Sequence, residues 1–464
     1  MSGPTQADPR PLESKAELIE ALSSGEKPRQ DWRIGTEHEK FIFHQATPSD
    51  LGAAQQSGMQ GARASYASGI RPLLEALKSL GWAPIEDQGN LVGLTRDGAA
   101  ISLEPGRQFE LSGATLESLH QTCDEAHRHL AELKPLCERL GLSLLGLGHD
   151  PVSQIETLDW MPKSRYAIMR RYMPQKGGLG HDMMLNTTTI QVNLDFSSEA
   201  DMVQKLRVGL ALQPLATALF ANSPLRHGQP TGYRSFRAHT WSDTDPERTG
   251  GLDFVFEAGM GYERYVDYAL DVPMYFVTRN RKPIDLAGAS FRRFFESGLD
   301  ALPGERALHQ DWSDHLTTLF PDVRLKSFLE MRGADGGSWA DICALPAFWV
   351  GLLYDQSALD AASDLIADWS AEERAALRQA TPKYGLDWPF RGRSLWDWAA
   401  ELVNLADAGL KSRKVAGKIS QDETEYLTPL HKRLAQRRHA SDAALDIWKA
   451  VDGDFAAFLE RMAY

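Results

Sequence analysis

Polar and apolar residues alternate strictly along one central stretch of the chain, from Asn186 to Phe196. A period of two predicts a β-strand with one apolar face and one hydrogen-bonding face. The apolar face carries Thr188, Ile190, Val192, Leu194 and Phe196, and the polar face carries Thr187, Thr189, Gln191, Asn193 and Asp195. A capping signal at Ser198 predicts a long apolar helix from about Ala200, so we expect the strand to lie inside the molecule. Its polar face then needs partners, and a ligand or a metal ion would supply them.

Three further strand-like segments, 34–43, 101–112 and 323–335, carry acidic residues at positions that a short strand or bend would bring to one side. The residues concerned are Glu37, Glu39, Glu104, Glu110, Glu330 and Arg332. Taken alone, each segment also fits an exposed strand or a surface hairpin with solvated charges. Two carboxylates about 7 Å apart inside a protein repel by roughly 2 kcal/mol, so their burial would require a cation.

The rest of the chain reads mainly as helices. The helix after the central strand contains Pro214, which is expected to kink or end it. We expect a flexible N-terminal arm over 1–14, a sheet-and-helix core over 15–345 that carries the candidate site, and a helical C-terminal region over 346–464 packed on that core. The predicted fold class is therefore α+β.

Composition narrows the possible functions. Of the 464 residues, 42% are hydrophobic and 24% are charged, as in an ordinary globular protein, and the formal net charge of −13 argues against a nucleic-acid partner. Cys123, Cys137 and Cys343 are too few and too scattered for a disulfide framework, so we expect core or surface thiols and a cytoplasmic location. The longest apolar span, 208–221, is short and contains Pro214, so we predict no membrane span.

Clustered oxygen ligands without histidine or cysteine at metal spacing suit Mg²⁺ or Mn²⁺. The chain has no phosphate-binding loop of the G-x4-G-K-[ST] type, and the G-x-G runs at 146–148 and 259–261 lack the third glycine of a dinucleotide site. The alternative is a sheet that binds ATP through metal ions. Arg237 and Arg332 would then stabilise charge on the transferred phosphoryl group.

Several longer motifs point to a known family. They are GTEHEKF at 35–41, MPKSRYAIM at 161–169, MMLNTTTIQVNLDFSSEADM at 183–202 and ANSP at 221–224. Over roughly residues 30–350 the chain closely resembles the plant-type glutamate-cysteine ligases, a form also found in proteobacteria. The resemblance implies a glutamine-synthetase-like fold, in which a curved, mainly antiparallel sheet forms a cup surrounded by helices.

The resemblance also implies a reaction, the first step toward glutathione. ATP would phosphorylate the γ-carboxylate of L-glutamate, and the amine of L-cysteine would displace phosphate to give γ-glutamylcysteine. By this resemblance the proposed metal ligands are Glu37, Glu39, Glu104, Glu110, Gln191 and Glu330. Arg332, together with Glu330, would act on the transferring phosphoryl group. The expected glutamate-binding residues are Arg237, Arg165, Tyr166 and Trp241, and the expected nucleotide contacts are Lys40, Asn193 and Arg248.

The sequence departs from the plant members of the family at two positions: those members carry Arg and Cys where this chain has Asn186 and Thr188. The cysteine pairs that plants use for redox control are also not evident. Three alternatives stay open: a ligase for another amine, a metal-dependent phosphohydrolase, and a sensor that binds nucleotide without turnover. We expect small-molecule substrates, no nucleic acid or membrane partner, and a monomer or weak homodimer.

Overall fold

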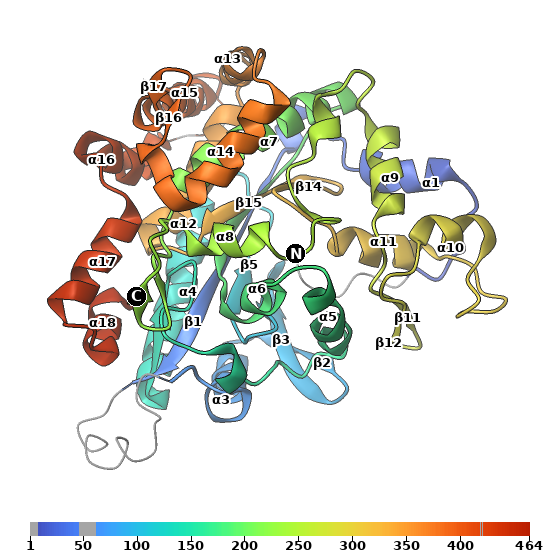
Figure 1. Ribbon diagram of the computed structural model, residues 1–464, viewed down its shortest axis with the longest axis horizontal. Helices are drawn as coiled ribbons and strands as arrows, with labels where there is room; N and C mark the ends of the chain where they lie inside the picture. Colours follow the sequence, from blue (N-terminus) through green and yellow to red (C-terminus); the bar gives the residue numbers. More distant parts are fainter. Residues whose placement is uncertain (1–7, 46–61, 418, 420) are drawn as a thin grey trace.

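The computed structural model describes residues 8–45, 62–417, 419 and 421–464, and its centre is one large antiparallel sheet (Figure 1). The strands follow one another in the order β14 (Val323–Leu325), β15 (Leu329–Asp335), β7 (Thr189–Leu194), β1 (Ile34–His44), β5 (Phe109–Ser112), β4 (Ala99–Leu103), β3 (Asn90–Arg96) and β2 (Ala83–Asp87). A further strand, β6 (Leu142–Leu145), pairs with the second half of β1. The α+β prediction is confirmed.

The register of this sheet brings the acidic segments together. Glu37 of β1 lies opposite Gln191 of β7, and Glu39 lies opposite Glu110 of β5. On the other side of β7, Glu330 of β15 lies opposite Asn193. The register of β15 shifts between Met331 and Ala334, so this strand has a local irregularity beside β7. Four strands distant in sequence therefore place their polar side chains on one face.

The apolar side of β7 faces a helical layer, as its alternation predicts. Ile190, Val192 and Leu194 are fully buried, in contact with α12 (Trp339–Leu353), while α7 (Glu199–Leu219) packs against β14 and β15. The same apolar cluster continues into α15 (Leu395–Val415). The C-terminal helices thus share their core with the central strands.

The remaining helices surround the sheet and continue to the C-terminus (Figure 1). They are α1 (Lys15–Ser23), α3 (Arg71–Lys78), α4 (Leu119–Leu140), α5 (Tyr166–Tyr172), α6 (Gly180–Asn186), α8 (Phe236–Ser242), α9 (Tyr262–Asp271), α10 (Phe291–Ser297), α11 (His309–Thr317), α13 (Gln356–Ile366), α14 (Ala371–Tyr384), α16 (Thr428–Gln436), α17 (Ala440–Ala450) and α18 (Phe455–Met462). Short two-stranded pairs form between β8 (Leu225–Arg226) and β9 (Gln229–Pro230), β10 (Thr249–Gly250) and β13 (Phe320–Pro321), β11 (Phe276–Arg279) and β12 (Lys282–Asp285), and β16 (Pro389–Phe390) and β17 (Arg393–Ser394).

Three local predictions need correction. The central strand begins at Thr189, because Asn186 ends α6 and the intervening backbone turns from helix to strand. The helix α7 continues through Pro214 to Leu219, so the proline does not end it, and the residues around it are buried. The segment 323–335 is a hairpin of β14 and β15 and not one strand, so Arg324 lies directly opposite Glu330.

The N-terminal arm and the cysteines were also assigned from sequence. Residues 1–7 of the expected arm lie outside the described residues, whereas Leu12 is buried and its N–H donates to the carbonyl of Ala307. All three cysteines are buried free thiols. Cys123 of α4 contacts Cys343 of α12, whose thiol, together with burial, raises the pKa of Cys123. Two cysteines that are far apart in sequence are therefore neighbours.

Among the helices that the structure describes, none alone has the length and apolar composition of a membrane span. Only α12 and α13 taken together pass that test, and they meet at an angle of 86°.

Candidate active site

A cavity of 140 Å³ lies between the polar face of the sheet and the helices α5, α6 and α8. Most of the residues selected from the sequence line it. These are Glu37, Glu39, Glu104, Glu110, Arg165, Tyr166, Gln191, Arg237, Trp241, Glu330 and Arg332. The strand register explains the convergence, because β1, β5, β7 and β15 are consecutive neighbours in the sheet.

One half of the cavity is acidic. Burial raises the pKa of Glu110 to about 7, with a further contribution from Glu37 and Glu104, although the hydroxyls of Ser102 and Ser112 each donate to it at 2.7 Å. Burial also raises the pKa of Glu39 well above its usual value, as do Glu104 and Glu110. These carboxylates therefore resist ionisation together unless positive charge is brought to them.

The other half of the cavity is built on paired charges. Arg324 forms a bidentate contact with Glu330, with Nε 2.6 Å from Oε2 and Nη2 2.9 Å from Oε1. Nη1 of Arg332 donates to Oε1 of Glu330 at 2.8 Å and to Oε1 of Gln191 at 2.9 Å. Burial alone would raise the pKa of Glu330. The pKa is nevertheless held well below its usual value by the cations Arg324, Arg332 and Lys326. Glu330 thus fixes the direction of the Arg332 side chain.

Arg237 enters the cavity from the first turn of α8. The N-cap of this helix, Ser235, accepts from the N–H of Ala238 at 3.0 Å, and the N–H of Arg237 donates to the hydroxyl of Ser223 at 3.1 Å. Both serine hydroxyls donate to the buried carboxylate of Asp335, at 2.6 and 2.7 Å. Nη2 of Arg237 donates to the carbonyl of Arg332 at 2.9 Å. Asp335 therefore ties the start of α8 to the end of β15.

Arg165 and Tyr166 come from the start of α5. The hydroxyl of Tyr166 donates to the carbonyl of Leu103 at 2.9 Å, next to Glu104, and the guanidinium of Arg165 lies 5.5 Å from the Tyr166 ring. Burial and the neighbouring Arg165 lower the pKa of Lys163 to about 8. Trp241 of α8 also lines the cavity, with its ring 5.9 Å from that of Phe320. All four predicted glutamate-binding residues thus line the cavity.

The three expected nucleotide contacts are not among the cavity-lining residues. Lys40 is fully buried, and its Nζ lies 2.8 Å from Nδ1 of His38; burial lowers the pKa of Lys40 to about 7. Arg248 is buried in an ion pair with Asp245 at 2.7 Å. Asn193 lies beside the cavity and donates to Oε1 of Glu37 at 2.8 Å. Alternation turns Lys40 away from Glu39, and Arg248 is engaged by Asp245 within the fold; the three nucleotide contacts stay a prediction.

The sequence did not single out Arg324 or Asp335. The signal for Arg324 was available, since a turn at 326–328 would have placed it opposite Glu330. Asp335 carries no such local signal, because its partners Ser223 and Ser235 are more than 95 residues away and are brought near only by tertiary packing.

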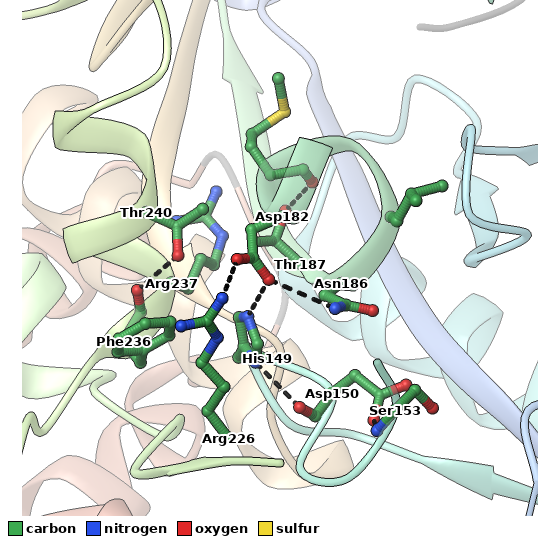
Figure 2. Close-up of polar contacts among 12 residues, drawn as sticks. His149, Asp150, Ser153, Asp182, Asn186, Thr187, Arg226, Phe236, Arg237 and Thr240 are labelled. Atoms are coloured by element: carbon green, nitrogen blue, oxygen red, sulfur yellow. Dashed lines mark hydrogen bonds and ion pairs between the residues drawn. The ribbon is translucent and has the colours of Figure 1, made fainter. Parts of the chain in front are cut away.

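A second polar cluster supports α6 from outside the cavity (Figure 2). Figure 2 shows Asp182 of α6 facing both His149 and Arg226. Nε2 of His149 is 3.4 Å from Oδ1 of Asp182, and Nδ1 donates to the carbonyl of Asp150 at 2.8 Å. Because α6 also carries Met183 and Met184, which line the cavity, this cluster holds one cavity wall in place.

Magnesium was predicted for this site, and the donor set can be tested for it. The oxygen donors Glu37, Glu39, Glu104 and Glu110 are of the kind that Mg²⁺ prefers, and the raised pKa values of Glu39 and Glu110 indicate a shortage of positive charge. Within the described ranges, however, no three acidic, histidine or cysteine side chains are arranged to hold an ion by themselves. The residues fit an ion that takes its other ligands from a bound substrate.

Comparison with known proteins gives a consistent result. Residues 33–460 match the family model for glutamate-cysteine ligase family 2. The chain is 52% identical over 401 residues to chloroplastic glutamate-cysteine ligase B of Oryza sativa subsp. japonica, covering 86% of this chain and 78% of that protein. It is also 52% identical to the chloroplastic glutamate-cysteine ligase of Nicotiana tabacum, covering 86% and 74%.

A solved structure shares the fold at low identity. The glutamate-cysteine ligase of Francisella tularensis, crystallised in complex with AMP, superposes with a TM-score of 0.54 at 14% identity, over 93% of this chain and 87% of that one. The expected glutamine-synthetase-like architecture is thereby confirmed. The expected cytoplasmic location is wrong by the same comparisons, because the plant relatives are chloroplastic proteins.

Proposed function

The chain belongs to glutamate-cysteine ligase family 2, and on that premise we propose how its cavity performs the reaction. The protein is an ATP-dependent ligase of the glutathione pathway that joins the γ-carboxylate of L-glutamate to the amine of L-cysteine. The products are γ-glutamylcysteine, ADP and phosphate. The roles that follow, of single residues and of magnesium, are our proposal.

The observation that supports this proposal is the division of the cavity into two halves. Glu39 and Glu110 form an acidic wall whose pKa values are raised by burial, while Arg332 and Arg237 form a cationic wall linked through a carbonyl at 2.9 Å. A phosphoryl transfer needs positive charge on the phosphate oxygens from both sides. The arginines of the cationic wall would supply positive charge from one side of the phosphate. Metal ions held by the acidic wall would supply it from the other side.

We propose Glu37, Glu39, Glu104 and Glu110 as the residues that hold Mg²⁺, together with nucleotide phosphate oxygens. Bound there, the ion would neutralise phosphate charge and orient the nucleotide. Glu330 and Gln191 have a different role in this proposal, because their oxygens already accept hydrogen bonds from Arg332. They would hold the guanidinium in place.

In the first step, an oxygen of the glutamate γ-carboxylate attacks the γ-phosphorus of ATP. A P–O bond to that carboxylate forms as the P–O bond to ADP breaks, giving a γ-glutamyl phosphate. Arg332 would stabilise the charge on the transferring group, and Arg237 and Arg165 would bind the carboxylates of glutamate. Arg237 is buried and Arg165 and Arg332 are partly buried, which strengthens these contacts.

In the second step, the amine nitrogen of cysteine attacks the acyl carbon. A C–N bond forms as the C–O bond to phosphate breaks, and phosphate leaves with both electrons of that bond. The amine proton goes to the departing phosphate or to solvent. No described side chain is required as a base in this scheme, because phosphate is itself a competent acceptor.

This proposal is tested by ADP release with Mg²⁺, ATP and glutamate, with and without cysteine, alongside mass spectrometry of the products. We expect ADP and γ-glutamylcysteine to appear together and in equal amounts. ADP formed only with a different amine would keep the chemistry and change the acceptor. ADP formed without any amino acid would indicate a phosphohydrolase and contradict the proposal.

A further inference from the structure

A second depression, the side cleft, adjoins the active-site cavity. It has a volume of 450 Å³ and lies between α8, the β10–β13 pair and α14. Arg237, Trp241, Phe320 and Arg332 line both spaces. The two spaces therefore meet at the arginines that face the transferred group in the proposed reaction.

The side cleft carries cationic groups of its own. Arg378 of α14 is exposed, and within the described part of the chain it has no hydrogen bond or ion pair. Its guanidinium lies against the backbone of Gly250 and Gly251, so that a Cβ on Gly251 would come 2.1 Å from Nη1. Lys383, one helical turn later, is also exposed, 5.4 Å from the ring of Tyr384. Both cations are free to meet an anionic ligand.

Asp322 connects the side cleft with the cavity. Burial raises the pKa of this carboxyl, and the cations that oppose the shift are Arg378, Arg237 and Arg332. Asp322 lines the side cleft together with all three of these arginines. A carboxylate bound at Arg378 would be part of the same charge network as the cations of the reaction site.

The proposed reaction requires a binding site for the acceptor amino acid. The acceptor amino acid has to present a neutral amine to the acyl carbon beside Arg332, while its own carboxylate stays bound and charged. Arg237 and Arg165 are already assigned to the carboxylates of glutamate. Arg378 is exposed and lines the same cleft as Arg332, so it suits a second carboxylate, since Arg binds carboxylates through two parallel hydrogen bonds.

We propose that the side cleft is the acceptor subsite and that Arg378 binds the carboxylate of the incoming amino acid. This inference rests on the proposed function and adds a specificity-determining residue to it. Amines that carry an adjacent carboxylate are then favoured over amines that lack one. The thiol of the acceptor plays no part in this contact.

The experiment compares two nucleophiles in the purified full-length chain. Cysteine carries a carboxylate, whereas hydroxylamine is a small nucleophile without one that also reacts with acyl phosphates. The variants are Arg378→Ala, Arg378→Glu and Arg378→Lys. The matched control is Arg139→Glu, since Arg139 is an exposed arginine of α4 that lines neither space.

For Arg378→Ala we expect the KM for cysteine to rise about 10- to 100-fold, the usual effect of losing a charged hydrogen bond. Arg378→Glu should raise it further, and Arg378→Lys should restore part of the affinity. The KM values for glutamate and ATP, the hydroxylamine-dependent rate and the melting temperature should each stay close to those of the Arg139→Glu control.

Other outcomes overturn the proposal. An unchanged KM for cysteine would mean that the carboxylate binds elsewhere, and a raised KM for glutamate would make the cleft part of the donor site. Equal losses with cysteine and hydroxylamine would mean that Arg378 acts on the chemistry through Arg332 or Arg237. If the unmodified protein forms neither product, the ligase function itself fails, which is distinct from every variant-specific result.

Discussion

At the scale of single residues, Arg332 is where the two halves of the active site meet. Its Nη1 bridges Glu330 and Gln191 at 2.8 and 2.9 Å, and its carbonyl accepts from Arg237. Arg324 fixes Glu330 in turn. Its Nη1 donates to the carbonyls of Thr317 and Leu319, and its Nε and Nη2 donate to the carboxylate of Glu330. The guanidinium of Arg332 is thus fixed before any substrate binds, as electrostatic catalysis requires.

Replacing Arg332 should therefore affect turnover more than binding. For Arg332→Gln we expect kcat to fall by roughly 10²- to 10³-fold, because a preorganised donor to the transferring group is lost. The KM for ATP should change far less. Steady-state kinetics with Arg139→Gln as control provide the measurement, and near-normal product formation by a folded Arg332→Gln protein would show that the assignment is wrong.

Glu110 allows a test of the proposed magnesium site. Its side chain is buried and lies beside Glu39 of the neighbouring strand β1. The pKa of Glu110 is raised to about 7. For Glu110→Gln we expect the Mg²⁺ concentration at half-maximal activity to rise at least about tenfold, since a charged oxygen donor becomes neutral. Chelation of Mg²⁺ should abolish activity in both proteins. An unchanged magnesium dependence in the variant would remove Glu110 from the ligand set.

The sequence predicted most of the cavity but not its supporting residues. Glu37, Glu39 and Glu110 could be found because alternation and spacing determine which side of a strand a residue faces. The same alternation argues against a place for Lys40 in the cavity, because Lys40 follows Glu39 and its side chain turns to the opposite face, beside His38. Arg248 has one local partner, Asp245 three residues earlier, but its other partners, the carbonyls of Thr318 and Pro273, come from distant loops.

At the scale of elements, the position of α8 relative to β15 sets the distance between the two cationic side chains. Asp335 makes this connection, since it accepts from Ser223, from Ser235 and from the N–H of Asn222 at 2.7 Å. All of these groups are buried. An uncompensated donor in such a place costs about 1–3 kcal/mol, so the network specifies one arrangement.

Asp335→Asn tests this connection, because the amide supplies one acceptor oxygen where the carboxylate supplies two. We expect the KM for glutamate to rise through displacement of Arg237, together with a lower melting temperature. The matched control is Asp341→Asn, which weakens the N-terminal cap of α12 and an ion pair with Arg433 at 2.8 Å, away from the cavity. Equal KM values in both variants would assign Asp335 a purely structural role.

Element boundaries were harder to predict than element types. A proline removes one backbone donor, yet α7 continues through Pro214 because the helix is buried on nearly all sides from Val208 to Leu219. The β14–β15 hairpin was predicted as one strand because residues 323–335 keep their alternation through the turn. In α7, burial outweighed the proline; in 323–335, a turn interrupts an alternation that looks continuous in the sequence.

At the scale of the whole molecule, one sheet collects residues from both halves of the chain into a single site. The strand order β15–β7–β1–β5 places Glu330, Gln191, Glu39 and Glu110 on neighbouring strands, although they come from positions up to 291 residues apart. The curved sheet was predicted from the family resemblance. Composition and periodicity alone did not predict the order of its strands. The oligomeric state expected from the sequence, a monomer or weak homodimer, stays a prediction.

The most direct test of the central claim follows an oxygen atom. L-glutamate labelled with ¹⁸O in its γ-carboxylate is supplied with ATP, Mg²⁺ and cysteine, and the released phosphate is analysed by mass spectrometry. If the cavity activates that carboxylate as an acyl phosphate, each phosphate carries one ¹⁸O and the dipeptide retains the other. Phosphate free of the label, formed at the same rate as ADP, would contradict the account.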